Sequence, residues 1–189
     1  MGRFVIVINR EYGSGGRTIG QMLAEELGIP WYNIDLERFA SEQSGISETF
    51  FAELNDRTKP VRPYLLNNVV DLKREPSPPG SSDYTSENNL ILHQAGAIRR
   101  IAEKENCVII GHGGVFSLED TDYAVRVFVH APKEFLLEQA ALKKSLPPAE
   151  LEKYVMMINR NREEFYKKFT GQSWSDARNY DLCINTGKL

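Results

Sequence analysis

Short runs of β-branched and other apolar residues alternate along the chain with segments of helical periodicity. The runs cover residues 4–8, 107–110, 124–129 and 181–184, with a weaker one at residues 31–32. The first two are apolar throughout, as is typical of strands buried in a parallel sheet. Apolar residues recur at helical spacing in three segments between the runs: Ile19, Met22, Leu23 and Leu27; Leu92, Ala95, Ile98, Ile101 and Ala102; and, less cleanly, Phe135, Leu136, Gln139 and Ala140. The alternation predicts an α/β fold in which right-handed crossovers join parallel strands and helices flank the sheet.

One region that departs from the alternation is rich in proline. Residues 56–87 contain Pro60, Pro63, Pro76, Pro78 and Pro79 and a Gly-Ser-Ser sequence. Prolines prevent regular backbone hydrogen bonding, so we expect an irregular insert above the sheet that is the least ordered stretch outside the termini.

A second departure is a long amphipathic segment at residues 147–171. It opens with two prolines, which suit the start of a helix. One helical face carries the apolar residues Leu151, Tyr154, Val155, Ile158, Phe165 and Phe169. Arg162 interrupts this face between Ile158 and Phe165, and a cation in such a place is a candidate functional residue.

Composition limits the class of protein. A chain of 189 residues with a net charge of −3 suits a single domain over residues 1–189 with one core. The basic pairs at 99–100 and 143–144 are short and lack interleaved aromatic residues, so we expect no nucleic-acid partner. No segment has the pattern of a membrane span or a cleaved leader, and we expect a cytoplasmic protein with no membrane partner. Cys107 and Cys183 lie in apolar runs and are expected to be small core residues rather than a disulfide or a zinc site.

The sequence between the first strand and the first helix points to phosphate binding. Residues 13–18 read Gly-Ser-Gly-Gly-Arg-Thr. Glycines allow backbone N–H groups to turn toward phosphate oxygens, and the helix that follows directs the positive end of its dipole at the same anion. Arg17 stands where the usual P-loop has Lys, Thr18 is placed to ligate Mg²⁺, and Glu11 occupies the position of the first glycine. A glycine-rich turn that only joins a strand to a helix is the alternative, but the buried strand before it and the Arg-Thr pair after it favour phosphate.

Several further motifs in the same order resemble the cytidylate-kinase-like family, a nucleoside monophosphate kinase branch of the P-loop NTPases. The resemblance covers nearly the whole chain except the proline-rich insert, and rests on these segments: Arg-Glu-Tyr-Gly-Ser-Gly-Gly-Arg-Thr-Ile-Gly at 10–20, Leu-Gly-Ile-Pro-Trp-Tyr at 27–32, Val-Ile-Ile-Gly at 108–111, Arg-Val-Phe-Val-His-Ala-Pro at 126–132, Phe-Thr-Gly at 169–171 and Asn-Tyr-Asp-Leu-Cys-Ile-Asn-Thr at 179–186. It implies a P-loop NTPase fold with a five-stranded parallel sheet, a monophosphate-side insert at about 56–87 and a helical lid at about 147–171. In this family Glu11 and Arg17 are the usual residues.

The resemblance also implies roles for individual residues. ATP phosphates would lie against Gly13, Ser14, Gly15, Gly16, Arg17 and Thr18, with Mg²⁺ on Thr18. Arg17, Arg160 and Arg162 would act on the transferred phosphoryl group, the last two from the lid. The acceptor would meet Asn33, Asp35, Arg38, Gly111 and His112. Arg160 and Arg162 could instead be solvated helix residues, and Asp35, Glu37 and Arg38 could face solvent, which is the expectation for Glu37.

Several positions depart from the family in the direction of lost charge. Asn33 and Asn159 replace aspartates, and His112, Leu136 and Gln139 replace arginines. His112 could still contact the acceptor as a neutral donor, or as a cation at lower pH. Family members also continue past the last strand with a base-contacting loop and a helix, whereas this sequence stops at Leu189, so we expect a base pocket that is incomplete or built differently.

Three functions remain open on the sequence. The first is transfer of the γ-phosphoryl group of ATP to CMP or a related monophosphate. The second is a catalytically weak nucleotide-binding or regulatory protein, suggested by the lost charges. The third is a kinase for a small molecule that is not a nucleotide, with the insert as its specificity element.

Overall fold

A computed structural model describes residues 2–33, 35–59 and 69–189. A five-stranded parallel sheet lies at its centre, with the strand order β2-β3-β1-β4-β5. The strands are β1 (Val5–Arg10), β2 (Trp31–Tyr32), β3 (Cys107–Ile110), β4 (Ala124–His130) and β5 (Leu182–Asn185). The predicted parallel sheet with flanking helices is therefore confirmed; β2 and β3 have the predicted ends, and the ends of the other strands differ from the prediction by at most two residues.

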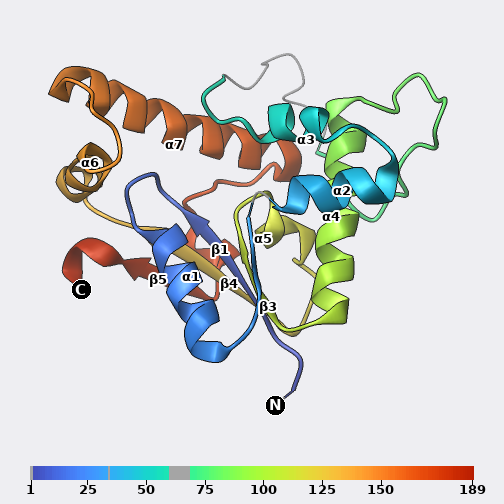
Figure 1. Ribbon diagram of the computed structural model, residues 1–189, viewed down its shortest axis with the longest axis horizontal. Helices are drawn as coiled ribbons and strands as arrows, with labels where there is room; N and C mark the ends of the chain where they lie inside the picture. The colour runs from blue at the N-terminus through green and yellow to red at the C-terminus, as the bar shows by residue number, and fades with distance from the viewer. Residues whose placement is uncertain (1, 34, 60–68) are drawn as a thin grey trace.

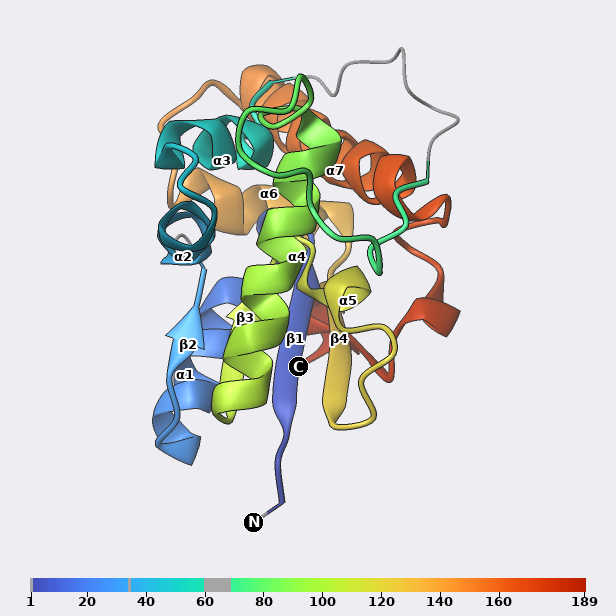
Figure 2. The same cartoon turned by 90° about the vertical axis from the view of Figure 1, so that its right-hand side faces the viewer.

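Helices cover both faces of this sheet and the carboxyl ends of its strands (Figures 1 and 2). They are α1 (Gly16–Leu27), α2 (Asp35–Ser44), α3 (Glu48–Asn55), α4 (Glu87–Lys104), α5 (Gly114–Ser117), α6 (Lys133–Ala141) and α7 (Pro148–Thr170), with 3₁₀ turns η2 (Ala177–Asn179) and η3 (Thr186–Lys188). Helix α1 packs on one face, and α4, α5 and the end of α7 pack on the other. Helices α6 and α7 lie beyond the carboxyl ends of β1 and β4, at the top of Figure 1.

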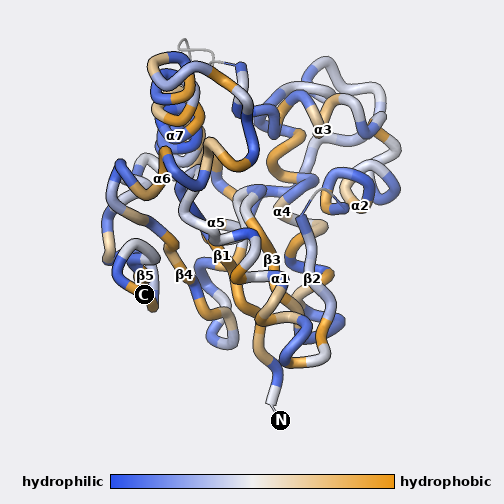
Figure 3. The backbone as a smooth tube through the Cα atoms, turned by 60° about the vertical axis from the view of Figure 1, so that its left-hand side comes forward, coloured by the Kyte–Doolittle hydropathy of each residue, from blue (hydrophilic) through white to orange (hydrophobic). Residues whose placement is uncertain are grey.

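Alternation along β1 divides the core between the two faces of the sheet. Val5 and Val7 pack with α4, α5 and α7, whereas Ile8 packs with α1. Beside them, β3 is buried at all four positions. The central strands accordingly run as apolar segments through the middle of the molecule (Figure 3). Burial of both faces explains why these strands are apolar throughout rather than alternating with polar residues.

The apolar stripe predicted for α1 is wrong in detail. Met22 and Leu27 are 63% and 38% exposed, and the helix buries Gly16, Gly20 and Ala24 instead. A Cβ at Gly20 would lie 2.7 Å from the Ile110 Cδ1 atom. The helix therefore approaches β3 through small residues, which the spacing of large apolar residues does not reveal.

The two cysteines have different environments. Cys107 is fully buried in β3, as predicted, whereas Cys183 is exposed in β5. Strand β5 is the edge of the sheet, and Leu182 beside the cysteine is 50% exposed. The expectation that Cys183 is a core residue is therefore wrong, because an apolar run on an edge strand is not covered on both faces.

The proline-rich insert is irregular, as predicted, where the structure describes it. Residues 69–86 form turns and bends, and residues 60–68 lie outside the described residues. The buried Asn89 side chain nevertheless organises the returning chain: its Oδ1 atom accepts from Ser77 N at 2.6 Å, and its Nδ2 atom donates to Tyr84 O at 2.8 Å. Side-chain hydrogen bonds thus replace a regular backbone pattern in this part of the insert. None of the helices in the described part of the chain is long and apolar enough to cross a membrane.

We expect the two sides of α1 to differ sharply in their contribution to stability. Ile110→Ala, at the fully buried position of β3 that packs against α1, should lower the free energy of unfolding by about 2–5 kcal/mol, because it leaves a cavity. Met22→Ala, on the exposed side of α1, should change it by less than about 0.5 kcal/mol. Urea denaturation followed by circular dichroism measures both. A large loss in Met22→Ala would show that the exposed side of α1 is covered in solution.

Candidate functional site

The loop between β1 and α1 has the backbone shape that phosphate binding needs. Gly13 and Gly15 adopt left-handed conformations with φ of 91° and 76°, and Gly15 is the N-cap of α1. The first amides of a helix have no partner within the helix and carry its positive dipole end. The predicted glycine-rich turn between β1 and α1 is present, and the first amides of α1 at residues 16–18 form a helix start of the kind that can bind an anion.

Contacts from three distant segments hold this loop in place. The Asn159 Oδ1 atom of α7 accepts from Tyr12 N at 2.7 Å, and the Thr186 hydroxyl donates to Ser14 O at 2.9 Å. The Glu11 carboxylate accepts from Ala131 N at 3.1 Å, which gives this residue a structural role in the loop. The loop is thus fixed by the chain before any ligand arrives.

Arg17 and Thr18 both lie exposed in the first turn of α1. The Arg17 guanidinium carbon is 5.7 Å from the centroid of the Trp31 ring. The Thr18 hydroxyl makes no hydrogen bond to any part of the chain that the structure describes. In the part of the chain that the structure describes, no group of three His, Cys, Asp or Glu side chains is arranged to hold a metal. Thr18 therefore fits a Mg²⁺ ion that takes most of its ligands from water and nucleotide phosphates.

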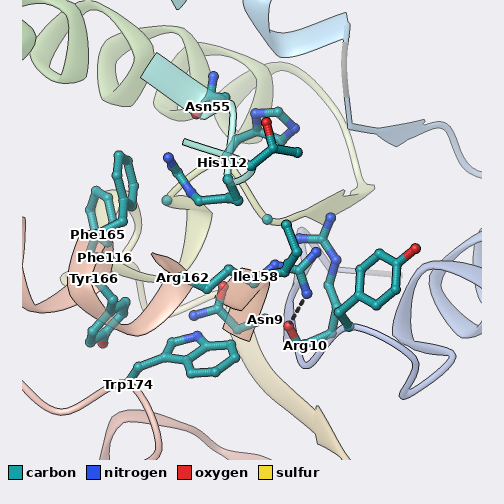
Figure 4. Close-up of a pocket in the computed structure, with 15 residues that line it drawn as sticks. Asn9, Arg10, Asn55, His112, Phe116, Ile158, Arg162, Phe165, Tyr166 and Trp174 are labelled. Carbon is teal, nitrogen blue, oxygen red and sulfur yellow. Dashed lines mark hydrogen bonds between the residues drawn. The ribbon is translucent and has the colours of Figure 1, made fainter. Parts of the chain in front are cut away.

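Beside the loop, a cavity of about 210 Å³ opens between the carboxyl ends of β1 and β3 and helix α7 (Figure 4). Aromatic residues Phe116, Phe165, Tyr166 and Trp174 form one side, and Arg10, Arg162 and His112 lie on the other side. The residues that line it are Asn9, Arg10, Tyr12, Asn55, Arg57, Thr58, Gly111, His112, Gly113, Phe116, Ile158, Arg162, Phe165, Tyr166 and Trp174. None of these is an aspartate or glutamate.

Three arginines from separate elements converge on this cavity. Arg10 ends β1, Arg57 follows α3 and Arg162 lies in the middle of α7. The Arg162 Nη1 atom donates to Arg10 O at 2.7 Å, the bond drawn in Figure 4. The Arg57 Nη1 atom donates to Leu54 O at 2.7 Å, and its guanidinium carbon lies 3.5 Å from the centroid of the Phe165 ring. Among the described residues, none of the three arginines forms an ion pair with a carboxylate.

The electrostatics of the cavity favour an anion. Burial, followed by repulsion from Arg162, lowers the pKa of Arg57 to about 9. Burial lowers that of Arg162 to about 10, and burial together with Arg162 and Arg17 lowers the pKa of Arg10 well below its usual range. All three stay protonated at neutral pH, because a guanidinium group keeps its proton in proteins. An anion of two charges would relieve both the desolvation and the mutual repulsion.

Comparison with known proteins agrees with this geometry. The model of the cytidylate kinase-like family matches residues 5–188. The chain belongs to the cytidylate kinase-like family. No curated protein matches the chain significantly. Among solved structures, an uncharacterized protein from Eubacterium ventriosum is 21% identical with a TM-score of 0.67, covering 98% of this chain and 89% of that one. The shikimate kinase of Bacteroides thetaiotaomicron is 15% identical with a TM-score of 0.53, covering 97% and 87%. These structures share the fold, which is that of a P-loop kinase.

In this cytidylate kinase-like protein Gly111 leaves space for the side chain of Arg10. Its φ is 78°, and a Cβ there would lie 1.9 Å from the Arg10 Nη1 atom. Gly111 therefore allows the Arg10 side chain to lie across the end of β3. The resemblance placed Gly111 on the acceptor side of the site, and it does line the cavity.

His112 lies in the cavity wall as a neutral ring. Burial, followed by repulsion from Arg10 and Arg57, lowers its pKa to about 3, which favours the neutral form over the cation. The His112 Nε2 atom is 3.3 Å from Asn33 Oδ1, and its Nδ1 atom is 3.8 Å from a Glu37 carboxylate oxygen. Glu37 is only 8% exposed, which corrects the expectation of solvent, and burial raises its pKa. His112 adopts a left-handed backbone with φ of 53°, a conformation that asparagine also tolerates.

Three of the predicted site residues lie away from this cavity. Asp35 is exposed at the start of α2, and Arg38 is paired with Glu42 at 3.9 Å on the outer side of the same helix. Arg160 is exposed and donates to Glu164 at 2.7 Å, one turn along α7. The structure brings Arg162 to the cavity but not Arg160, because residues two apart on a helix point in different directions.

The predicted lid is one continuous helix that is already packed. Phe165 and Phe169 of α7 lie in the main core, and Arg162 reaches the cavity in this conformation. Arg162 therefore lines the cavity without any movement of this helix. Its position between Ile158 and Phe165 on the buried face is as predicted.

Arg10 and Arg57 are cavity residues that the sequence did not single out. Arg10 follows a run of buried strand residues, so its place at the carboxyl end of β1 could have marked it, since ligands of open α/β sheets bind at that edge. Arg57 lies at the edge of the proline-rich insert, and no local pattern places it beside Phe165. Leu136 and Gln139 stand where the family has arginines, but arginines from other positions line the cavity. Leu136 is buried against the phosphate loop.

We expect His112 to make stability depend on pH. Its folded pKa of about 3 lies below its ordinary value of 6.5, so its contribution is complete above pH 6.5 and is lost as the pH falls toward 3. Between pH 7.5 and pH 5 the wild type should lose about 2 kcal/mol more unfolding free energy than His112→Asn, which keeps the left-handed backbone but cannot titrate. Urea titrations at both pH values measure the difference. Equal losses in the two proteins would show that the ring is accessible to protons.

Proposed function

We propose that this protein transfers the γ-phosphoryl group of ATP to an acceptor that already carries a phosphate, with CMP or a related nucleoside monophosphate as the first candidate. The observation that carries the proposal is the cavity beside the phosphate loop, which collects Arg10, Arg57 and Arg162 without a carboxylate among its lining residues. Membership of the cytidylate kinase-like family supports the same reaction class.

Among the described residues that line the cavity, none is suited to act as a general base, and this separates two kinds of acceptor. A hydroxyl acceptor must lose its proton during transfer, and kinases for such acceptors use a positioned base. In the described lining the titratable groups besides the arginines are Tyr12, Tyr166 and His112, and the low pKa of His112 makes it a weak base. A phosphate acceptor is an anion at neutral pH and needs no base. The cavity therefore favours a monophosphate over a small alcohol.

The arginines would act by position and charge. Phosphoryl transfer spreads negative charge over the oxygens of the transferred group, and fixed cations stabilise that charge in a site shielded from water. Arg162 and Arg10 lie on the side of the cavity next to the phosphate loop, because the bond between them ends at the last residue of β1. Arg57 lies on the insert side and would hold the acceptor phosphate. The retained cations argue against a protein that only binds nucleotide.

The donor side would be formed by the phosphate loop. Backbone N–H groups of residues 13–18 would hold the ATP phosphates, Arg17 would meet them from the helix start, and Thr18 would share a Mg²⁺ ion with them. The ion would neutralise phosphate charge and orient the donor.

A phosphotransfer screen tests the proposal directly. With ATP and Mg²⁺ present, we expect product from CMP, dCMP, UMP or AMP and none from small alcohols, detected by coupled ADP release and confirmed by mass of the product. Transfer to an alcohol but not to any monophosphate would replace the proposal with a small-molecule kinase. ATP binding without transfer to any acceptor would leave a nucleotide-binding protein.

Neighbouring arginines of α7 should respond differently to substitution. Arg162→Ala should lower kcat by about tenfold or more, because it removes a cation from the transferred group. The matched control Arg160→Ala should stay within about twofold of wild type, because that side chain is exposed and paired with Glu164. Arg17→Ala should mainly weaken ATP affinity, since Arg17 lies at the rigid start of α1. Steady-state kinetics and ATP titration measure these effects, and equal kcat values for Arg162→Ala and wild type would contradict the assignment.

A further inference from the structure

Helix α7 contacts both ends of the proline-rich insert through one face. Asn161, Phe165 and Lys168 are spaced four and three residues apart, so they lie on the same side of the helix. The Asn161 Nδ2 atom donates to Arg57 O at 2.7 Å, and Phe165 lies under the Arg57 guanidinium. Lys168 is paired with Glu87, the first residue of α4, where the chain returns from the insert.

An adjacent face of the same helix contacts the phosphate loop. Asn159 accepts from Tyr12 N, Arg162 donates to Arg10 O, and the Tyr154 ring packs edge-on against Tyr12 with 5.5 Å between centroids. Helix α7 therefore joins the donor loop to the segment that carries Arg57. Asn161 bonds to the backbone of Arg57. This hydrogen bond therefore fixes the position of the Arg57 main chain and not the groups that its side chain binds.

Asn161 has properties that suit this position. It is 4% exposed, and burying a carboxamide in a mostly apolar interface costs free energy unless it forms hydrogen bonds. Its Nδ2 atom donates to the carbonyl oxygen of Arg57. Arg57 lies two residues after the end of α3 and has no regular backbone pairing. The side chain of Arg57 is then confined between Leu54 O and the Phe165 ring, four residues further along α7. One helix thus fixes both the backbone and the guanidinium of Arg57.

We propose that Asn161 is a positioning residue that places Arg57 in the anion cavity, so that Asn161 acts on acceptor binding only through Arg57. The inference rests on the proposed function in taking Arg57 as the residue that holds the acceptor phosphate. It assigns no contact between Asn161 and any substrate. Loss of the Asn161 donor should therefore weaken anion binding at the cavity and leave the donor loop unchanged.

Inorganic phosphate is the probe, because it tests the cavity without requiring turnover. Asn161→Leu removes the donor at nearly constant volume, and Glu163→Gln changes an exposed side chain two residues along as a matched control. Arg57→Met keeps much of the side-chain stem but removes the charge, so it identifies the part of phosphate binding that depends on the cavity. Calorimetry gives the affinity, and the ¹⁵Nε signal of Arg57, assigned by its loss in Arg57→Met, reports the position of the guanidinium.

We expect Asn161→Leu to weaken Arg57-dependent phosphate binding by about tenfold and to shift the Arg57 signal, with ATP affinity within about twofold of wild type. In the Arg57→Met background, the same substitution should have no further effect. Asn161→Gln, which keeps the carboxamide, should recover part of the affinity. Asn161→Ser provides the same measurement if the leucine variant does not fold.

Opposite results overturn the inference. These are an unchanged phosphate affinity and Arg57 signal in Asn161→Leu, losses that add in the double variant, or no Arg57-dependent phosphate binding in the wild type. Failure of the proposed function is distinguishable, because it would appear as a lack of phosphoryl transfer to any monophosphate while the phosphate titrations still follow Asn161. In a transferring wild type, Asn161→Leu should raise the KM for the acceptor more than it lowers kcat.

Discussion

Mutual repulsion among three partly buried guanidinium groups is the constraint on which the site depends. Arg10, Arg57 and Arg162 come from the sheet, the insert and α7, and each is partly desolvated without a carboxylate partner among the described residues. Such a cluster destabilises the folded chain unless surrounding contacts hold it. The carbonyl groups of Leu54 and Arg10 and the face of the Phe165 ring supply those contacts. The same contacts keep the cations in place for a ligand that neutralises them.

This arrangement explains why losing individual charges need not abolish an anion site. The family resemblance led us to expect fewer charges in the cleft, because Leu136 and His112 stand at arginine positions. Leu136 is instead used to pack α6 against the phosphate loop, whose Gly13 leaves no space for a side chain: a Cβ there would lie 2.4 Å from Leu136 O. His112 remains uncharged because the neighbouring arginines oppose its protonation. Charge at this site is therefore a property of the cluster rather than of any one position.

The sequence was most informative where local pattern and tertiary structure agree. Four runs of β-branched and other apolar residues, with a weaker one at residues 31–32, located the strands of the described sheet, and the glycines between β1 and α1 predicted the turn there, because both signals are set within a few residues. Arg162 was found because it breaks an apolar stripe. Prediction failed where the outcome depends on what covers a segment: Cys183 is exposed on an edge strand, and Glu37 is buried by distant residues. Arg57 was missed because only the packing of α7 brings it to the cavity.

The close approach of Arg10 to Gly111 has a consequence for how this site can change over evolution. Any side chain at position 111 would occupy the space of the Arg10 guanidinium, and its left-handed backbone adds a second penalty. A side chain therefore cannot be added at position 111 while Arg10 keeps this conformation, so among relatives a larger residue at 111 should accompany a change at position 10. A relative with a larger residue at position 111 would have to turn the arginine at the end of β1 elsewhere or lose it, and its cavity would then hold one cation fewer for the molecule it binds.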